Sequence, residues 1–116
     1  MKIHKLFADD IVIYILASLP NNNFNTIDIH ELFYELKQLH PICFKSLNFN
    51  TSSCTPYCEL IERILMRGYI SGILQYDNSF TNKQSSINHI MKKLSPYQIA
   101  QLQKIINSAN QIYQPN

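Results

Sequence analysis

The sequence predicts a mostly helical α+β domain, in which helices precede a small β-hairpin and a long helix closes the chain. Three observations predict this architecture. Residues 55–68 form a capped apolar stripe with helical spacing. Two short apolar segments, residues 69–76 and 87–94, flank a run of turn-forming polar residues. Residues 95–116 begin with a helix-capping serine and continue with a second, longer helical stripe.

Length and composition limit the class of protein. The chain has 116 residues and 46% apolar residues, enough for one domain with a modest core. Its longest apolar run, residues 11–19, is too short to cross a bilayer, and two aspartates precede it, unlike in a secretory signal. Three cysteines do not indicate a disulfide framework. We therefore expect a cytoplasmic protein without a membrane partner.

Charge is distributed unevenly along the chain. Residues 1–36 contain two lysines and five acidic residues, a balance of −3, whereas residues 37–116 contain eight basic and three acidic residues, a balance of +5. A basic half suits a polyanionic partner. The alternative is a solvated surface with a small excess of lysine.

Residues 9–19 predict a first helix that is buried on all sides. Asp9 or Asp10 is placed to cap it, and the eight apolar residues that follow leave almost no polar face. Because β-branched residues are weak helix formers, a strand is the alternative for this segment.

A second helix is expected from Asp28 to the residue before Pro41, with Glu31 placed for a capping box. Residues 24–27 are compatible with a very short strand before it, and residues 42–47 with a short extra helix after it. The core stripe of the second helix consists of Ile29, Leu32, Phe33 and Leu36.

The third helix is predicted to begin at Thr55, with Pro56 in the first helical position, and to end at Gly68 in a left-handed conformation. Its apolar stripe consists of Leu60, Ile61, Ile64 and Leu65. We expect Leu60, Ile61 and Ile64 to be buried against Ile13, Leu16, Leu32 and Leu36.

The segment Leu60-Ile61-Glu62-Arg63-Ile64-Leu65-Met66-Arg67-Gly68-Tyr69-Ile70 resembles the end of a recognition helix that runs into the first strand of a wing. The order of elements is similar to that of the PadR-like transcriptional regulators, a winged-helix group. The resemblance implies a winged helix-turn-helix domain in residues 1–94 and a packing or dimerisation helix in residues 95–116. It also implies a small cytoplasmic regulator that binds double-stranded DNA as a homodimer, without a cofactor.

In a winged helix the outward face of the third helix enters the major groove. Here that face carries Glu59, Glu62, Arg63 and Met66, of which Arg63 suits guanine, and the glutamates repel phosphate although glutamate also accepts from cytosine. Lysines in and after the polar loop suit the DNA backbone, or else are ordinary surface lysines. The predicted DNA-binding residues are Ser52, Ser53, Thr55, Glu59, Arg63, Lys83, Lys92 and Lys93.

The last helix has Ser95 as its cap and Pro96 in its first turn. Its apolar stripe spans more than four turns, and it packs either on the first helix or on a second copy of the chain. The predicted dimer interface consists of Ile99, Leu102, Ile106, Ala109 and Tyr113.

Metal and catalytic chemistry have little support in the sequence. The residues His40, Cys43, Cys54 and Cys58 supply zinc-ligand types, but the spacing is irregular and contains no Cys-x2-Cys pair, so we predict no metal site. Catalytic motifs such as Gly-x-Ser-x-Gly and His-Glu-x-x-His do not occur. We predict no enzymatic activity, although Cys58 with a nearby histidine is a conceivable nucleophile.

The sequence leaves a second functional hypothesis open. The two glutamates on the third helix and a net charge of only +2 are unfavourable for phosphate binding. They favour a protein-interaction module or inhibitor, of the kind that phages and plasmids encode, which binds a host protein without reading DNA.

Overall fold

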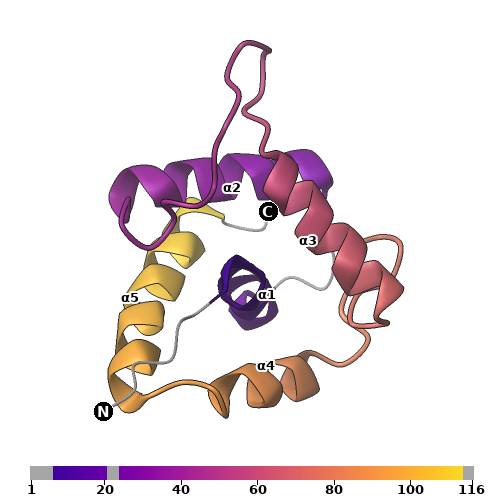
Figure 1. Cartoon of the computed structure of the whole chain (residues 1–116), viewed down its shortest axis with the longest axis vertical. Helices are drawn as coiled ribbons and strands as arrows, with labels where there is room; N and C mark the ends of the chain where they lie inside the picture. Colours follow the sequence, from indigo (N-terminus) through magenta and orange to yellow (C-terminus); the bar gives the residue numbers. More distant parts are fainter. Residues whose placement is uncertain (1–6, 21–23, 114–116) are drawn as a thin grey trace.

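The computed structural model describes residues 7–20 and 24–113. In the described part of the chain, four helices surround a central one (Figure 1). The helices are α1 (Ala8–Ser18), α2 (Thr26–Leu39), α3 (Glu59–Ile70), α4 (Lys83–Met91) and α5 (Pro96–Ile112). The central helix is α1, which packs against α3, α4 and α5, while α2 packs against α5.

The apolar character of the first helix explains its central position. All side chains from Ile11 to Ala17 are buried, and Ile15 has no exposed surface. A helix without a polar face is stable in water only when neighbours cover it on every side. The prediction of a buried first helix is confirmed.

Local capping signals define α2 and α5. The side chain of Asn25, rather than Asp28, caps α2 by accepting a hydrogen bond from the N–H of Ile27 at 2.8 Å. The predicted cap of α5 is confirmed at Ser95, which also forms a full capping box with Gln98. The predicted core stripe of α2 is buried and consists of Ile29, Leu32, Phe33 and Leu36.

The predicted β-hairpin wing is wrong. Within the residues that the structure describes there is no sheet, and residues 87–94 belong mostly to α4 rather than to a second wing strand. The only trace of a hairpin in the region is an isolated antiparallel bridge between Leu74 and Phe80. The fold is therefore helical, and the winged-helix class does not describe it.

The role predicted for Gly68 is also wrong, because α3 continues through this residue to Ile70. A Cβ atom at Gly68 would lie 2.8 Å from Cδ1 of Leu74, so glycine lets the returning chain pack against the helix without displacing this side chain. The left-handed glycine that follows the helix is Gly72, with φ 82°.

The predictions of a short strand before α2 and of an extra helix after it are also wrong. Residues 26 and 27 begin α2 instead of ending a short strand, and residues 41–46 form turns rather than an extra helix. At the start of α3, Cys58 rather than Thr55 occupies the N-cap position. Of the three side chains predicted to be buried there, Ile61 and Ile64 are buried, but Leu60 is half-buried.

The stripe of α5 lies in the same hydrophobic core as the other helices. Leu102, Ile105, Ile106 and Ala109 are each at most 5% exposed, and α5 contacts both α1 and α2. Packing on the first helix, one of the two predicted alternatives, is confirmed. Among the described residues, no helix has the length and apolar character needed to cross a membrane.

A candidate protein-binding cavity on α3

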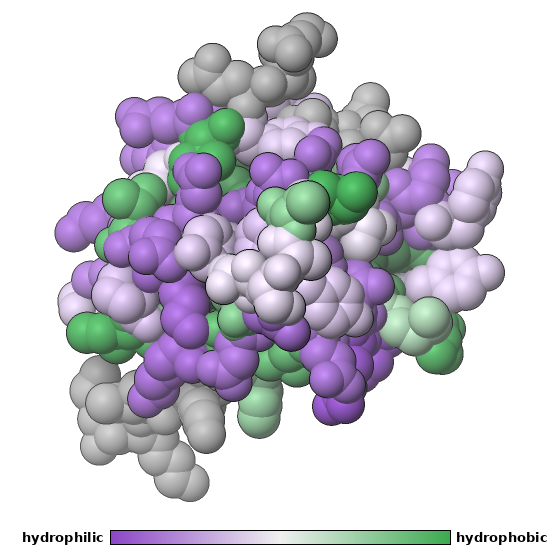
Figure 2. All heavy atoms as spheres, turned by 90° about the horizontal axis from the view of Figure 1, so that it is seen from above, coloured by the Kyte–Doolittle hydropathy of each residue, from purple (hydrophilic) through white to green (hydrophobic). Residues whose placement is uncertain are grey.

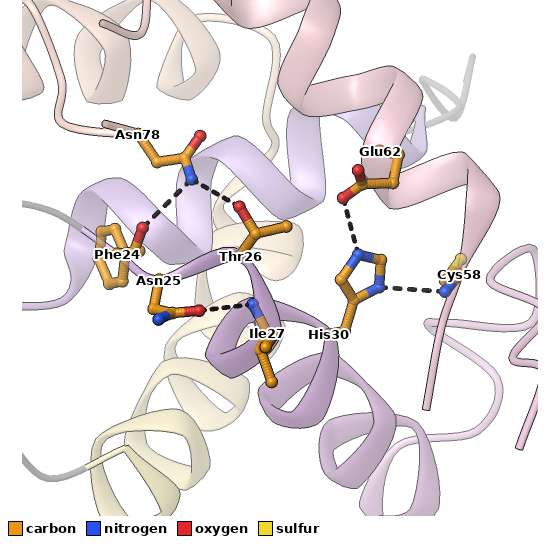
Figure 3. A network of polar contacts seen from close by, with 8 residues as sticks. All are labelled: Phe24, Asn25, Thr26, Ile27, His30, Cys58, Glu62 and Asn78. Atoms are coloured by element: carbon orange, nitrogen blue, oxygen red, sulfur yellow. Dashed lines mark hydrogen bonds and ion pairs between the residues drawn. The ribbon is translucent and has the colours of Figure 1, made fainter. Parts of the chain in front are cut away.

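A buried histidine connects α2 to the start of α3 (Figure 3). The backbone N–H of Cys58 donates to Nδ1 of His30 at 3.0 Å, and Nε2 of the same ring lies 2.8 Å from Oε2 of Glu62. Because Nδ1 accepts a hydrogen bond, the ring proton resides on Nε2 and is donated to the carboxylate. The ring of Tyr57 stacks on His30 with its centroid 5.0 Å away. Glu62 is thus held in a fixed orientation.

A tight turn after α3 is anchored to the beginning of α2 (Figure 3). The Asn78 backbone is left-handed, with φ 64°, and its Nδ2 donates to the carbonyl of Phe24 at 3.1 Å and to Oγ1 of Thr26 at 3.2 Å. Asp77 accepts hydrogen bonds from the hydroxyl and the backbone N–H of Ser79, which lower the pKa of its carboxyl. Asparagine tolerates this backbone conformation better than most residues.

Between these two networks lies a cavity of about 280 Å³, which we call the Glu62 cavity. It is lined by Thr26, Glu62, Leu65, Met66, Tyr69, Gln75, Tyr76 and Asn78. Three of the lining side chains are large and exposed: Met66 is 57%, Tyr69 53% and Tyr76 86% exposed. Figure 2 shows the molecule from above the view of Figure 1, and on this face hydrophilic residues are interspersed with small hydrophobic areas.

The surroundings of the Glu62 cavity are acidic. One adjoining cavity shares Thr26, Tyr76 and Asn78 with the Glu62 cavity, and a third cavity shares Asp28 and Tyr113 with that second one. Among the residues that the structure describes, no lysine or arginine lines any of the three. The carboxylates of the second and third cavities belong to Asp28, Glu31, Glu35 and Asp77. Burial, and secondly the field of Asp28, raise the pKa of the Tyr113 hydroxyl.

The structure does not bring the predicted DNA-binding residues together on one face. Ser52, Ser53 and Thr55 lie in a loop that projects beyond α2, and α4 lies on the opposite side of α1 (Figure 1). The loop residues bond mainly within the loop: Ser52 donates to Asn50, and the Ser53 hydroxyl donates to the carbonyl of Thr55. These residues contribute no continuous surface with α4.

Most of the predicted DNA-binding cations have partners within the chain. Arg63 pairs with Glu59 at 2.5 Å, and Lys93 pairs with Asp10 at 3.4 Å. The ammonium group of Lys83 donates to the carbonyl of Leu19 at 2.7 Å, and burial lowers its pKa. Lys92 is exposed near the end of α4.

The predicted dimer interface is partly used inside the monomer. Leu102, Ile106 and Ala109 are buried in the core, while Ile99 and Tyr113 are half-buried. The ring of Tyr113 packs against that of Phe24 with centroids 5.7 Å apart. Dimerisation stays a prediction, but these three buried side chains are not accessible to a second copy of the chain.

The cysteine and histidine residues do not form a metal centre among the residues that the structure places. No group of three or more potential metal ligands occurs there. His40 instead bonds to the hydroxyl of Ser108 at 3.1 Å, Cys54 is exposed, and Cys58 is fully buried. As a conceivable nucleophile, Cys58 is inaccessible, and His30 contacts its backbone rather than its thiol.

A larger cavity of about 540 Å³ lies between α1, α3 and α4. Buried isoleucines line it, together with two ion pairs, Asp9 with Arg67 at 2.7 Å and Asp10 with Lys93 at 3.4 Å. Each lining aspartate is thus paired with a lining cation.

The sequence pattern placed Glu62 and Met66 on the outward face of the third helix, but it did not predict a cavity there. Tyr69 and Tyr76 were expected on a wing strand, and the sequence predicted no structural role for His30. The available signal was Met66, which the helical spacing places opposite the core stripe.

No protein-family model, curated protein or solved structure matches this chain.

Proposed function

We propose that this protein is a protein-interaction module whose partner docks on the rim of the Glu62 cavity. One observation carries this proposal: three large, exposed side chains, those of Met66, Tyr69 and Tyr76, surround a single cavity. Exposed apolar and aromatic clusters around a concave site mark interaction surfaces, and tyrosine and methionine are enriched there.

The rigidity of the cavity walls supports the proposal. Met66 and Tyr69 lie three positions apart on α3, whose opposite face is held in the core by Ile61 and Ile64. Tyr76 follows the chain reversal after α3 and precedes Asn78, whose side chain is bonded to the start of α2. A surface that is already ordered loses less conformational entropy on binding.

The competing hypothesis of a DNA-binding regulator stays a prediction, and the contacts of its cations give it less support. Binding to DNA depends on releasing counterions through several lysine or arginine contacts to phosphate. Here Arg63, Lys83 and Lys93 each contact an acceptor within the chain. The outward face of α3 also carries Glu62, which repels phosphate.

A photo-crosslinking amino acid at two positions tests the proposal in the cells that encode the protein. Gln75 lines the Glu62 cavity, whereas Tyr97 is 72% exposed on α5, on the other side of α1. We expect a discrete crosslinked protein from position 75 and none from position 97. Met66→Ser should remove the product, and Met91→Ser, on α4, should leave it unchanged.

Two outcomes would overturn the proposal. One is equal crosslinking from positions 75 and 97, or from the parent protein and Met66→Ser. The other is tight binding to duplex DNA that weakens steeply with salt and survives Met66→Ser, because the exposed surface around Met66 would then not be the functional one.

A further inference from the structure

We infer that the Glu62 cavity receives a lysine or arginine side chain of the partner. This inference rests on the proposed function and adds to it the chemistry of the residue that is recognised. It depends on the carboxylate in the cavity, on the aromatic side chains around that carboxylate, and on the charge of the neighbouring surface.

The carboxylate of Glu62 is oriented and accessible at the same time. His30 donates to Oε2 at 2.8 Å, and the glutamate side chain is 40% exposed. An ionised carboxylate has about four acceptor positions, so one hydrogen bond leaves capacity for a second donor. A cationic donor is the strongest partner that a carboxylate finds in a protein interface.

The aromatic lining suits the same kind of group. Tyr69 and Tyr76 line the cavity, and so does Met66, which has a polarisable thioether. The electron-rich face of a tyrosine ring attracts ammonium and guanidinium groups within about 6 Å. The lysine and arginine side chains also have apolar stems, which the Leu65 side chain in the cavity lining can contact.

The size of the cavity favours one side chain over a whole small molecule. Its volume of about 280 Å³ lies just below the range of roughly 300–1,000 Å³ that is typical of sites for drug-sized molecules. If one side chain fills the cavity, the exposed side chains of Met66, Tyr69 and Tyr76 around it can contact the rest of the partner's surface.

The neighbouring charges favour a cationic partner over an anionic one. Carboxylates of Asp28 and Asp77 line the adjoining cavity, and those of Glu31 and Glu35 line the next cavity along α2. In the described part of the chain, none of the three cavities is lined by lysine or arginine. The larger cavity on the other side of α3 differs, because its charges form pairs of opposite sign. Charge complementarity thus points to a basic partner.

Short peptides test the inference without knowledge of the natural partner. Acetyl-Gly-Arg-Gly-amide and acetyl-Gly-Lys-Gly-amide should shift the backbone amide signals of Glu62, Tyr69 and Tyr76 in NMR titrations. The matched peptides with a central glutamate or leucine should not. Glu62→Gln should weaken binding of the two basic peptides about tenfold, as loss of a charged hydrogen bond implies.

The substitution Glu62→Gln removes the charge but keeps an oxygen that can accept from His30, so the fold should persist. Glu59→Gln is the matched control, since Glu59 lies one turn earlier on α3, outside the cavity. Equal binding of the leucine peptide, equal losses from both glutamine variants, or no localised shifts with the basic peptides would each overturn the inference.

The inference and the proposed function can fail separately. Crosslinking from position 75 could be lost in Met66→Ser but retained in Glu62→Gln. This result would support the protein-interaction module and contradict the binding of a cationic side chain. Localised binding of the basic peptides without any crosslinked protein would support a cation-binding cavity and reject docking of a partner on its rim.

Discussion

The backbone N–H of Cys58 donates to Nδ1 of His30 across 28 positions of sequence. This hydrogen bond satisfies a buried donor at the start of α3 and determines which ring nitrogen carries the proton. The proton on Nε2 then orients the carboxylate of Glu62. The contact between α2 and the start of α3 thus also orients Glu62, which lines the candidate binding cavity.

Replacing His30 with alanine should destabilise the fold. The change leaves the Cys58 N–H buried without its acceptor, which costs about 1–3 kcal/mol, and it also removes the ring that stacks on Tyr57. Urea denaturation measures the change in free energy of unfolding. His89→Ala, an exposed histidine on α4, is the control and should stay within about 0.5 kcal/mol of the parent protein. Similar stabilities of the two variants would contradict the structural role of His30.

Replacing Gly68 with alanine should destabilise the protein despite the higher helix propensity of alanine. Alanine gains about 0.5–1 kcal/mol inside a helix, whereas overpacking a core typically costs about 1–3 kcal/mol. The added Cβ would lie 2.8 Å from Cδ1 of Leu74, a buried side chain with little room to move.

A double-mutant cycle tests the origin of this effect. The double variant Gly68→Ala with Leu74→Ala should lose less unfolding free energy than the two single variants lose together. The reason is that the clash is absent once Leu74 is shortened. Strict additivity of the denaturation free energies would show that the contact between these residues is not responsible.

Replacing Ile106 with alanine should lower stability at every protein concentration. Ile106 is 5% exposed in the core, and truncating a buried isoleucine costs about 2–5 kcal/mol. Thermal unfolding measured over a hundredfold range of concentration distinguishes the two uses predicted for the α5 stripe. If the loss of melting temperature depends on concentration, the side chain belongs to a dimer interface instead.

The pKa of Asp77 predicts a pH dependence of the turn beside the cavity. Hydrogen bonds from Ser79 lower this pKa in the folded state below the model-compound value of 3.8. The resulting stabilisation is therefore present above about pH 3.8 and is lost as the pH falls through the folded value. Carbon NMR of the carboxyl group measures the titration directly.

Ser79→Ala should raise the pKa of Asp77 without restoring it fully to 3.8, because the backbone N–H of residue 79 still donates to the carboxylate. Thr81→Ala, in the same loop, is the control and should leave the titration unchanged. An unchanged pKa in Ser79→Ala would show that the hydroxyl does not stabilise the charged form.

Several elements of the fold could be predicted because their signals are local. The segment from Ile11 to Ala17 has no polar face, so it is buried whatever surrounds it. Ser95, Pro96 and Gln98 start a helix through contacts within one turn, and the stripe of α2 repeats at helical spacing. These features depend on residues at most a few positions apart.

The wing could not be excluded from the sequence, because its signals were ambiguous. A glycine suits a helix end as well as close packing inside a helix, and the contact between Gly68 and Leu74 decides for packing. Ile87, Ile90 and Leu94 fit a strand poorly and a helix well, yet the preceding cap is provided by Asn82, which was interpreted as a turn residue.

By itself the sequence determined the start of α5, the buried central helix and the core stripe of α2, since each follows from contacts along one segment of chain. Only the tertiary structure decided how the charges are used and where the cavity lies. Lys93 pairs with Asp10 across 83 positions, and Lys83 reaches the carbonyl of Leu19 across 64. Such partners meet only after the helices have packed, and they contact two of the cations that the sequence had suggested for DNA. The same packing brings Glu62, Tyr69 and Tyr76 around one cavity, because α3 and the turn after it are fastened to α2 by His30 and Asn78.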